Sequence, residues 1–114
     1  MRCRAIIVSP HVAKYADPIA FHAGERVAVH QADAEFPGWH WCTNALGKEG
    51  WVHASFLSAT VGNAVGLLDY SAAELTVSVG DEGVLLEKLG GWVYFQADDG
   101  AIGWVPENHV RVAV

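Results

Sequence analysis

An internal repeat with a spacing of 53 residues is the feature that most constrains the fold of this 114-residue chain. In the first copy Gly38–Cys42 is followed by Gly50–His53, and in the second Gly91–Phe95 is followed by Gly103–Pro106. Each of these four segments begins with Gly-Trp, and the spacing within the two copies is the same. A sequence that repeats itself in this way forms two similar structural units. Each unit then has about 60 residues, which is near the lower limit for a domain that folds alone.

Both copies are patterned as short β-strands. Apolar or β-branched runs follow a turn of glycine and acidic residues, and the Gly-Trp segments alternate large side chains on two faces. The segments 44–50 and 97–100 are rich in Asn, Asp and Gly, which is typical of hairpin turns. No window of 12 residues has a helical period with caps. The sequence therefore predicts an all-β fold with five short strands in each unit, closed into two small tandem barrels.

The positions of the repeats predict the domain boundaries. We expect one domain over residues 1–58, a short linker over residues 59–65 and a second domain over residues 66–114.

Composition and charge exclude several classes of partner. The net charge is −6, and the seven Lys and Arg residues do not cluster, so nucleic acid is excluded as a partner. A basic or neutral peptide suits such a surface better. No run of about 20 apolar residues predicts a membrane-spanning helix, and the N-terminus lacks the apolar run of a signal peptide. We therefore expect a cytoplasmic protein that does not contact a membrane.

The residues that could carry chemistry do not form a known catalytic or metal-binding pattern. The six histidines show no H-x-x-x-H or H-E-x-x-H spacing, so no metal and no cofactor are predicted. His40 and Cys42 share a strand face, but no third partner or oxyanion donor accompanies them. The chain is therefore predicted not to be an enzyme. Cys3 and Cys42 are expected as reduced thiols, and a bridge between them stays open because both could lie on neighbouring strands.

The second half resembles a Src homology 3 (SH3) domain. Gly66-Leu67-Leu68-Asp69-Tyr70 resembles the opening A-L-Y-D-Y of that family, and Glu74–Val77 with Gly80-Asp81 resembles its E-L-S-F…G-D/E stretch. Gly91-Trp92 resembles the start of the third strand, and Gly103–Val110 resembles G-Y/W-V-P-x-N-Y-V. The resemblance covers residues 65–112 and implies an SH3-like barrel.

The first half resembles a divergent copy of the same domain. Ala5-Ile6-Ile7-Val8-Ser9 stands in the place of A-L-Y-D-Y, and Gly50–Leu57 stands in the place of G-Y-V-P-x-N-Y-V. The whole chain is similar to small bacterial tandem SH3 proteins, often called ligand-binding SH3 proteins, and the segments 15–19 and 37–42 carry that similarity.

The resemblance implies an aromatic groove for an extended peptide, mainly on the second domain. Such a groove stacks aromatic rings against a preformed polyproline II ligand. The matching positions in the second domain are Tyr70, Trp92, Trp104, Pro106, Asn108 and His109. Leu68 and His109 stand where the family has tyrosines, and the first loop is short. These departures disfavour a pocket selective for arginine in the second domain.

The first domain retains fewer of the expected groove residues. Ile7 and Ser9 occupy its tyrosine positions and His53 replaces the proline, which leaves Trp39, Trp51, Phe56 and Tyr15 as candidates. For the tryptophans, the alternative is packing in the core. We expect Trp39 and Trp92 to lie at the surface and Trp41 in the core, while Trp51 and Trp104 are undecided between the two.

Two functions are consistent with the sequence. The first is a non-catalytic interaction module that binds an extended peptide. A proline-rich sequence is one form of such a peptide. The alternative is a structural protein whose aromatic surfaces are buried in a homodimer or larger homo-oligomer, since an exposed aromatic patch serves either role. The mass of the protein in solution separates them.

Overall fold

The computed structural model describes residues 2–113 and divides the chain into two compact units. Unit 1 comprises Met1–Lys14 together with Glu74–Val114, and unit 2 comprises Tyr15–Ala73. Residues 1 and 114, at which the predicted domains begin and end, lie outside the described residues. The described part of the chain contains antiparallel sheets and two short 3₁₀ turns but no α-helix, so the predicted all-β fold is confirmed.

Unit 1 is built on a five-stranded sheet in the order β10-β9-β8-β1-β11. Its strands are β1 (Cys3–Ile7), β8 (Glu82–Leu89), β9 (Trp92–Ala97), β10 (Ile102–Pro106) and β11 (Val110–Val112), and a 3₁₀ turn, η2 (Glu107–His109), precedes β11. Alternate residues of these strands point to one side and form the hydrophobic core. The core contains Ala5, Ile7, Val77, Leu85, Val93, Phe95 and Val105.

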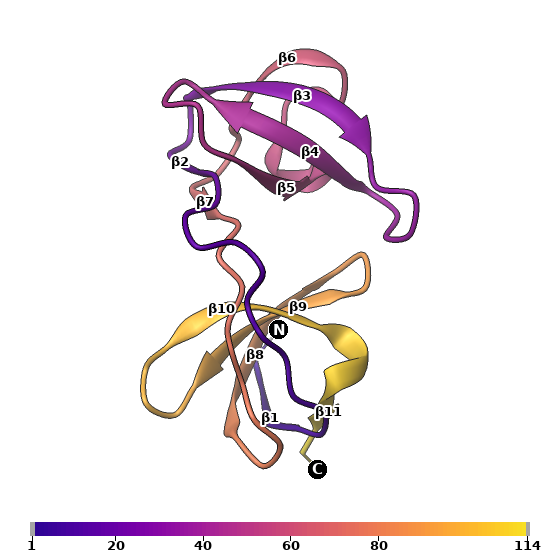
Figure 1. Ribbon diagram of the computed structural model, residues 1–114, viewed down its shortest axis with the longest axis vertical. Coiled ribbons are helices and arrows are strands. Elements are labelled where there is room, and N and C mark those ends of the chain that lie inside the picture. The colour runs from indigo at the N-terminus through magenta and orange to yellow at the C-terminus, as the bar shows by residue number, and fades with distance from the viewer. Residues whose placement is uncertain (1, 114) are drawn as a thin grey trace. The chain divides into compact units, whose positions relative to one another are not determined.

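The N-terminal strand β1 completes the sheet of the C-terminal half of the chain. It lies between β8 and β11, where Ala5 is opposite both Gly83 and Val112. In Figure 1 the indigo β1 accordingly lies beside the orange and yellow strands. Arg4 of β1 donates two hydrogen bonds to Asp98, with N–O distances of 2.7 and 2.9 Å. These bonds hold the pKa of the Asp98 carboxyl below its ordinary value.

Unit 2 is a continuous stretch of chain with a four-stranded sheet in the order β5-β4-β3-β6. The strands are β3 (Arg26–Ala32), β4 (Trp39–Asn44), β5 (Glu49–His53) and β6 (Gly62–Val65), with a 3₁₀ turn, η1 (Ala54–Phe56), after β5. Two short strands, β2 (Ala20–Phe21) and β7 (Tyr70–Ser71), pair with each other. Its buried apolar residues include Ile19, Phe21, Val27, Val29, Cys42, Val52, Leu57 and Ala64.

The structure divides the chain differently from the predicted boundaries at 58 and 66. The predicted linker, residues 59–65, contains strand β6, which pairs with β3 of unit 2. The predicted first domain includes β1, which belongs to unit 1. The physical reason is strand pairing: β1 finds its two neighbours in the second half of the chain, so unit 2 is inserted between β1 and the rest of unit 1.

The two units nevertheless have the same pattern of pairing. Ala5 is opposite Gly83 in unit 1, and Ala64 is opposite Val27 in unit 2. Ile7 pairs with Val110, and the equivalent residue Gly66 pairs with Leu57. Segment 62–71 therefore occupies the same structural position in unit 2 that segment 3–12 occupies in unit 1. The resemblance matched Ile7 with Leu68, but the register equates it with Gly66, a shift of two residues.

Register shifts shape the hairpins of both units, and a glycine turn closes the one between β4 and β5. The β3–β4 pair shifts register between Val29 and Ala32, and β8–β9 shifts between Leu85 and Glu87. Such bulges bend the strands and increase their twist. In the turn between β4 and β5, the side-chain oxygen of Asn44 accepts hydrogen bonds from the backbone N–H groups of residues 46 and 48. Gly47 in that turn has a φ of 81°, a conformation that favours glycine.

Candidate functional site

Three rings of unit 1 form a cluster around His11. Its ring packs edge-on against Trp92 and against His109, with centroid distances of 5.8 Å in both cases. Trp92 begins β9, His109 ends η2, and His11 comes from the segment after β1. All three side chains are partly buried. Residues of three separate segments are therefore brought to one surface, which we call the His11 cluster (His11, Trp92, His109 and the neighbouring residues Glu74 and Pro106).

Pro106 of this cluster and the nearby Asn108 are two further residues that the sequence predicts for a groove. Pro106 is directly opposite Trp92 in the β9–β10 ladder. It is also the residue before the 3₁₀ turn that contains Asn108, whose side chain is exposed. The backbone N–H of Glu107 donates to the carbonyl of Gly91 at 2.9 Å and fixes the turn beside the start of β9. A proline therefore lies opposite the tryptophan, and an exposed amide follows it two residues later in the turn.

His11 and Glu74 form the polar part of the cluster. The distance from His11 Nε2 to Glu74 Oε1 is 2.7 Å, and the two side chains are only 10% and 9% exposed. His11 is held in place by two backbone hydrogen bonds with Val77. His109 Nδ1 is buried and has no hydrogen-bond partner in residues 2–113. The sequence did not indicate His11 or Glu74 as site residues, because they are 63 positions apart and only strand pairing brings them together.

Two residues predicted for the same groove are buried. Tyr70 belongs to unit 2, where its hydroxyl donates to the carbonyl of Trp51 at 2.6 Å and its ring packs on Phe56. Trp104 is in unit 1 but only 4% exposed, and it packs against Tyr94 across the β9–β10 ladder. The prediction that both rings would be accessible to a ligand in a groove is therefore wrong. The register of the strands makes His11 the unit 1 equivalent of Tyr70.

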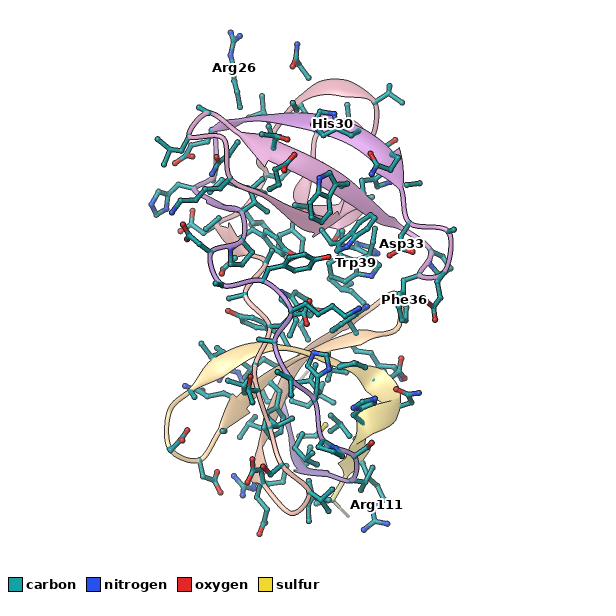
Figure 2. The ribbon with its side chains drawn as sticks, viewed as in Figure 1. Arg26, His30, Asp33, Phe36, Trp39 and Arg111 are labelled. Atoms are coloured by element: carbon teal, nitrogen blue, oxygen red, sulfur yellow. The ribbon has the colours of Figure 1, made fainter. Side chains whose placement is uncertain are left out.

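Trp39 also differs from its prediction as a surface residue. It is 4% exposed and packs edge-on against His53, with a centroid distance of 5.3 Å. A turn places Trp39 at the start of β4: its carbonyl accepts from the N–H of Asp33, and its own N–H donates to Phe36. Figure 2 shows these three residues near one another. Phe56 is partly buried, packing on Tyr70.

Three further aromatic rings of unit 2, those of Tyr15, Trp41 and Trp51, pack on one another. Trp41 packs edge-on against Trp51, directly opposite it on β5, at 5.1 Å, and Tyr15 packs on Trp41 at 5.7 Å. Tyr15 is 40% exposed, whereas both indoles are half-buried. The prediction of Trp41 as a core residue is therefore wrong. Trp39 and Trp41 do share a strand face, but Trp39, the first residue of β4, is the one whose side chain is buried.

The two cysteines lie in different units and are not bonded to each other. Cys3 is in β1 of unit 1, and Cys42 is in the core of unit 2. The Cys42 thiol donates a weak hydrogen bond to the carbonyl of His40, with an S–O distance of 3.5 Å. Burial raises the pKa of Cys42 to about 11. A thiol with such a pKa is protonated at neutral pH and is a poor nucleophile.

His53 caps the 3₁₀ turn η1. Its Nδ1 accepts from the N–H of Ser55 at 3.1 Å. Burial, and then the nearby His40, lower the pKa of His53. A lowered pKa in the folded state means that the unfolded chain binds the proton more readily. Stability is therefore fully present above the unfolded pKa of about 6.5 and falls as the pH decreases from there towards the folded pKa.

His53→Asn is expected to reduce this acid sensitivity. Asparagine can still cap the turn, since its side-chain oxygen accepts a backbone N–H, but it does not titrate. Urea unfolding at pH 7.5 and pH 5.5 should show a smaller loss of stability for the variant than for the original protein. His22→Asn, at an exposed histidine of the same unit, is the control. An equal loss in the original protein and His53→Asn would contradict the assignment.

The described residues give no sign of a metal centre or a membrane span. No three His, Cys, Asp or Glu side chains among residues 2–113 come together as a metal site would require. Within the same residues, no helix has the length and hydropathy needed to cross a bilayer.

Comparison with known families gives one match. Residues 4–59 match the family model described as the variant SH3 domain. No curated protein and no solved structure matches the chain significantly. The matched range is continuous in sequence, but the structure places residues 4–14 in unit 1 and residues 15–59 in unit 2.

Proposed function

We propose that the protein is a non-catalytic interaction module made of two SH3-like barrels, and that it binds an extended peptide at the His11 cluster of unit 1. The variant SH3 match at residues 4–59 supports the first part of this proposal. The proposal extends to both units because the strands of unit 1 and unit 2 pair in equivalent registers. An SH3 domain is a protein-interaction module, so the partner is a protein or peptide.

The observation that carries the choice of site is the meeting of Trp92, Pro106 and His109. The sequence predicted these three as groove residues, and strand pairing and ring packing bring them into one cluster. Three other predicted ring positions, Trp39, Trp104 and Tyr70, are less than a tenth exposed. Of the two tryptophans of unit 1 that were predicted for the groove, Trp92 is the one that is partly accessible.

The chemistry of the cluster suits an extended and largely apolar ligand. The indole of Trp92 and the ring of Pro106 provide apolar surfaces against which proline or aliphatic side chains can pack. The exposed amide of Asn108 can donate to and accept from the backbone of the ligand. His11 is already paired with Glu74, so the interior of the cluster is polar but satisfied at that pair.

Trp92→Ala is expected to reduce peptide affinity at least about 30-fold, because a tryptophan in a binding surface is commonly a hot spot. A set of immobilised synthetic peptides, proline-rich and proline-free, would first identify a binder of the full chain, with an affinity of about micromolar. Titration calorimetry would then compare the variants. Ile102→Ala, at an exposed apolar residue of β10 outside the cluster, is the matched control and should bind normally.

Unchanged binding by a folded Trp92→Ala would contradict the proposed site. If Trp92→Ala fails to fold, Trp92→Phe provides the measurement, since phenylalanine retains a ring but has a smaller face. A tenfold or greater loss for Asn108→Ala together with full binding by Trp92→Phe would move the site to the 3₁₀ turn.

One observation favours homo-oligomerisation as a second candidate function. Four large apolar residues of one segment in unit 2 are at least two fifths exposed: Val61, Val65, Leu67 and Leu68. An exposed apolar patch of this kind can serve as a protein interface. Light scattering on the full chain distinguishes the two candidates, because a stable dimer that dissociates in Leu67→Ser/Leu68→Ser would favour the oligomeric one.

A further inference from the structure

The first strands of the two units occupy equivalent places but are exchanged between the halves of the chain. Segment 3–12 completes unit 1, and segment 62–71 completes unit 2. Residues 4–59, however, match the variant SH3 domain as one continuous segment, and a domain made of these residues alone would need segment 3–12 in the sheet of unit 2. We call the observed arrangement the exchanged pairing and the alternative the direct pairing.

The first difference between the two pairings is the space available at Gly66 and at the equivalent Ile7. In unit 2 a Cβ at Gly66 would lie 2.5 Å from the ring of Phe21, which is closer than two carbon atoms can approach. In unit 1 Ile7 is 1% exposed and belongs to the core with Val77, which is smaller than phenylalanine. In the direct pairing Ile7 would therefore overlap the ring of Phe21. Gly66 would in turn leave the place of Ile7 empty in the core of unit 1.

The second difference is the charge next to the first strand. Arg4 donates to Asp98 at 2.7 and 2.9 Å and lies 3.7 Å from Glu82. In unit 2 the uncharged Asn63 is the equivalent of Arg4, and the register puts Arg26, labelled in Figure 2, in the place of Glu82. In the direct pairing Arg4 would lose both carboxylates and lie beside the like charge of Arg26. Because these side chains are exposed, this effect is weaker than the overlap of buried groups.

The third difference is the partner of Glu74. Its carboxylate lies 2.7 Å from His11, and the two side chains are only 9% and 10% exposed. In unit 2 the equivalent of His11 is Tyr70, which packs on Phe21 at 5.5 Å and donates to the carbonyl of Trp51. In the direct pairing Tyr70 would replace His11, so Glu74 would lose a partner that can carry a positive charge. A carboxylate at that depth is costly unless it is well paired.

Other equivalent positions do not distinguish the two pairings. Ala5 and Ala64 are identical and are both buried. Ile6 and Val65 differ by one methylene group, and their side chains point away from the cores because their neighbours on the strand point inward. The difference between the pairings is therefore concentrated at a few residues.

We propose that four residues of the first strands select the exchanged pairing. We call them the sorting residues: Arg4 and Ile7 of segment 3–12, and Asn63 and Gly66 of segment 62–71. The exclusion of Ile7 by Phe21 is the main effect, because Phe21 is buried and its ring cannot move out of the way without a loss of packing. The ion pairs of Arg4 act in the same direction. The direct pairing would therefore destabilise both units at once.

The pairing also decides which side chain stands beside Trp92. Only the exchanged pairing brings His11 there, whereas the direct pairing would bring Tyr70. This consequence rests on the proposed peptide site, but the selection of the pairing does not, because it is measured without a ligand. A failure of either proposal can therefore be recognised without the other.

The test compares the full chain with a variant in which the sorting residues are reversed, Arg4→Asn/Ile7→Gly/Asn63→Arg/Gly66→Ile. Nuclear Overhauser contacts between Hα protons identify the pairing, since opposite residues that share no backbone hydrogen bonds have Cα atoms only about 4.5 Å apart. In the original protein position 4 should contact Val84, and position 63 should contact Ala28. In the reversed variant position 4 should contact Ala28 instead, and position 63 should contact Val84. A folded reversed variant that keeps the original contacts would overturn the proposal.

Ile6→Val/Val65→Ile is the matched control, because it also exchanges residues between equivalent positions of the two first strands. It should keep the original contacts. A change of pairing in this control would overturn the assignment to the sorting residues.

A second measurement applies if the reversed variant fails to fold. Gly66→Ala should lower the urea midpoint of unit 2, followed by the NMR signals of Val52, because its Cβ meets the ring of Phe21. The same substitution in a Phe21→Val background should lower the midpoint by about half as much or less, since residues in contact are not additive. An equal loss in both backgrounds would mean that Phe21 does not exclude a side chain at position 66, and would overturn the proposal.

Discussion

A fragment of residues 15–73 is expected to fold alone, whereas fragments 1–58 and 66–114 are expected to stay unfolded. The first fragment contains every strand of unit 2, from β2 to β7. With about 60 residues it is small but within the range of domains that fold independently. Its sheet and core would be the same as in the full chain, so it should unfold cooperatively on heating.

Fragments cut at the boundaries suggested by the repeat lack essential strands. Fragment 1–58 lacks β6, so β3 loses one of its two neighbours, and it contains β1 without either partner. Fragment 66–114 lacks β1, which lies between β8 and β11. Ala5 and Ile7 of β1 belong to the core of unit 1, so its removal exposes the remaining core residues. A domain of this size has a margin of only a few kcal/mol and does not tolerate such a loss.

Circular dichroism melting and the dispersion of amide signals in NMR spectra measure these outcomes. A complementation experiment makes the test sharper. A peptide of residues 1–14 added to fragment 74–114 should restore folded structure, because together they make unit 1. The same peptide should have no effect on fragment 15–73. Independent folding of fragment 1–58 would contradict the pairing, since it would mean that β1 completes the sheet of its own half.

The strands and turns of this protein follow from local sequence, and they were predicted well. Trp39–Asn44 and Trp92–Ala97 alternate as strands must, and the turns after them are made by residues suited to turns. The exchange of first strands could not be predicted in the same way. Segments 3–12 and 62–71 occupy equivalent registers, so local patterns do not distinguish which sheet each will join.

The site residues were predicted in part, for a related reason. Trp92, Pro106 and His109 come from a single half of the chain, and the motif that contains them is continuous. His11 comes from the other end of the sequence and was missed. If the two halves of the chain had been aligned by matching Ala5 with Ala64, His11 would have been found as the equivalent of Tyr70. Motif spacing shifted the alignment by two residues, which only the backbone pairing corrects.

Exposure of aromatic rings was the least predictable property. Alternation correctly put Trp39 and Trp41 on one face, but it does not say which end of a face is covered. The sizes of core residues that contact each other were unpredictable in the same way. In unit 2 the large Phe21 packs closely against Gly66, and in unit 1 the equivalent positions hold Val77 and Ile7. Such compensation in size depends on contacts between distant segments, which a single sequence does not reveal.

Phe95→Ala is expected to destabilise unit 1 by about 3–5 kcal/mol, the range for removing a fully buried phenylalanine side chain. Phe95 is completely buried in the core, and Gly83 on the neighbouring strand leaves room for its ring. A Cβ at Gly83 would lie 2.7 Å from the tip of that ring and 2.2 Å from the carbonyl oxygen of Gln96. Because glycine has no side chain that could move into the space, the cavity left by Phe95→Ala would remain open, which places the cost high in the range.

The equivalent position in unit 2 supplies a matched control for this substitution. There Cys42 occupies the place of Phe95 and Val27 the place of Gly83, so the same space is filled from the opposite strand. Cys42→Ala removes only a sulfur atom and should cost roughly 1 kcal/mol. Urea unfolding, followed separately by the NMR signals of Val93 in unit 1 and Val52 in unit 2, measures both variants. A loss below about 1.5 kcal/mol in Phe95→Ala would mean that the core closes around the missing ring, and that Gly83 does not set the size of its neighbour.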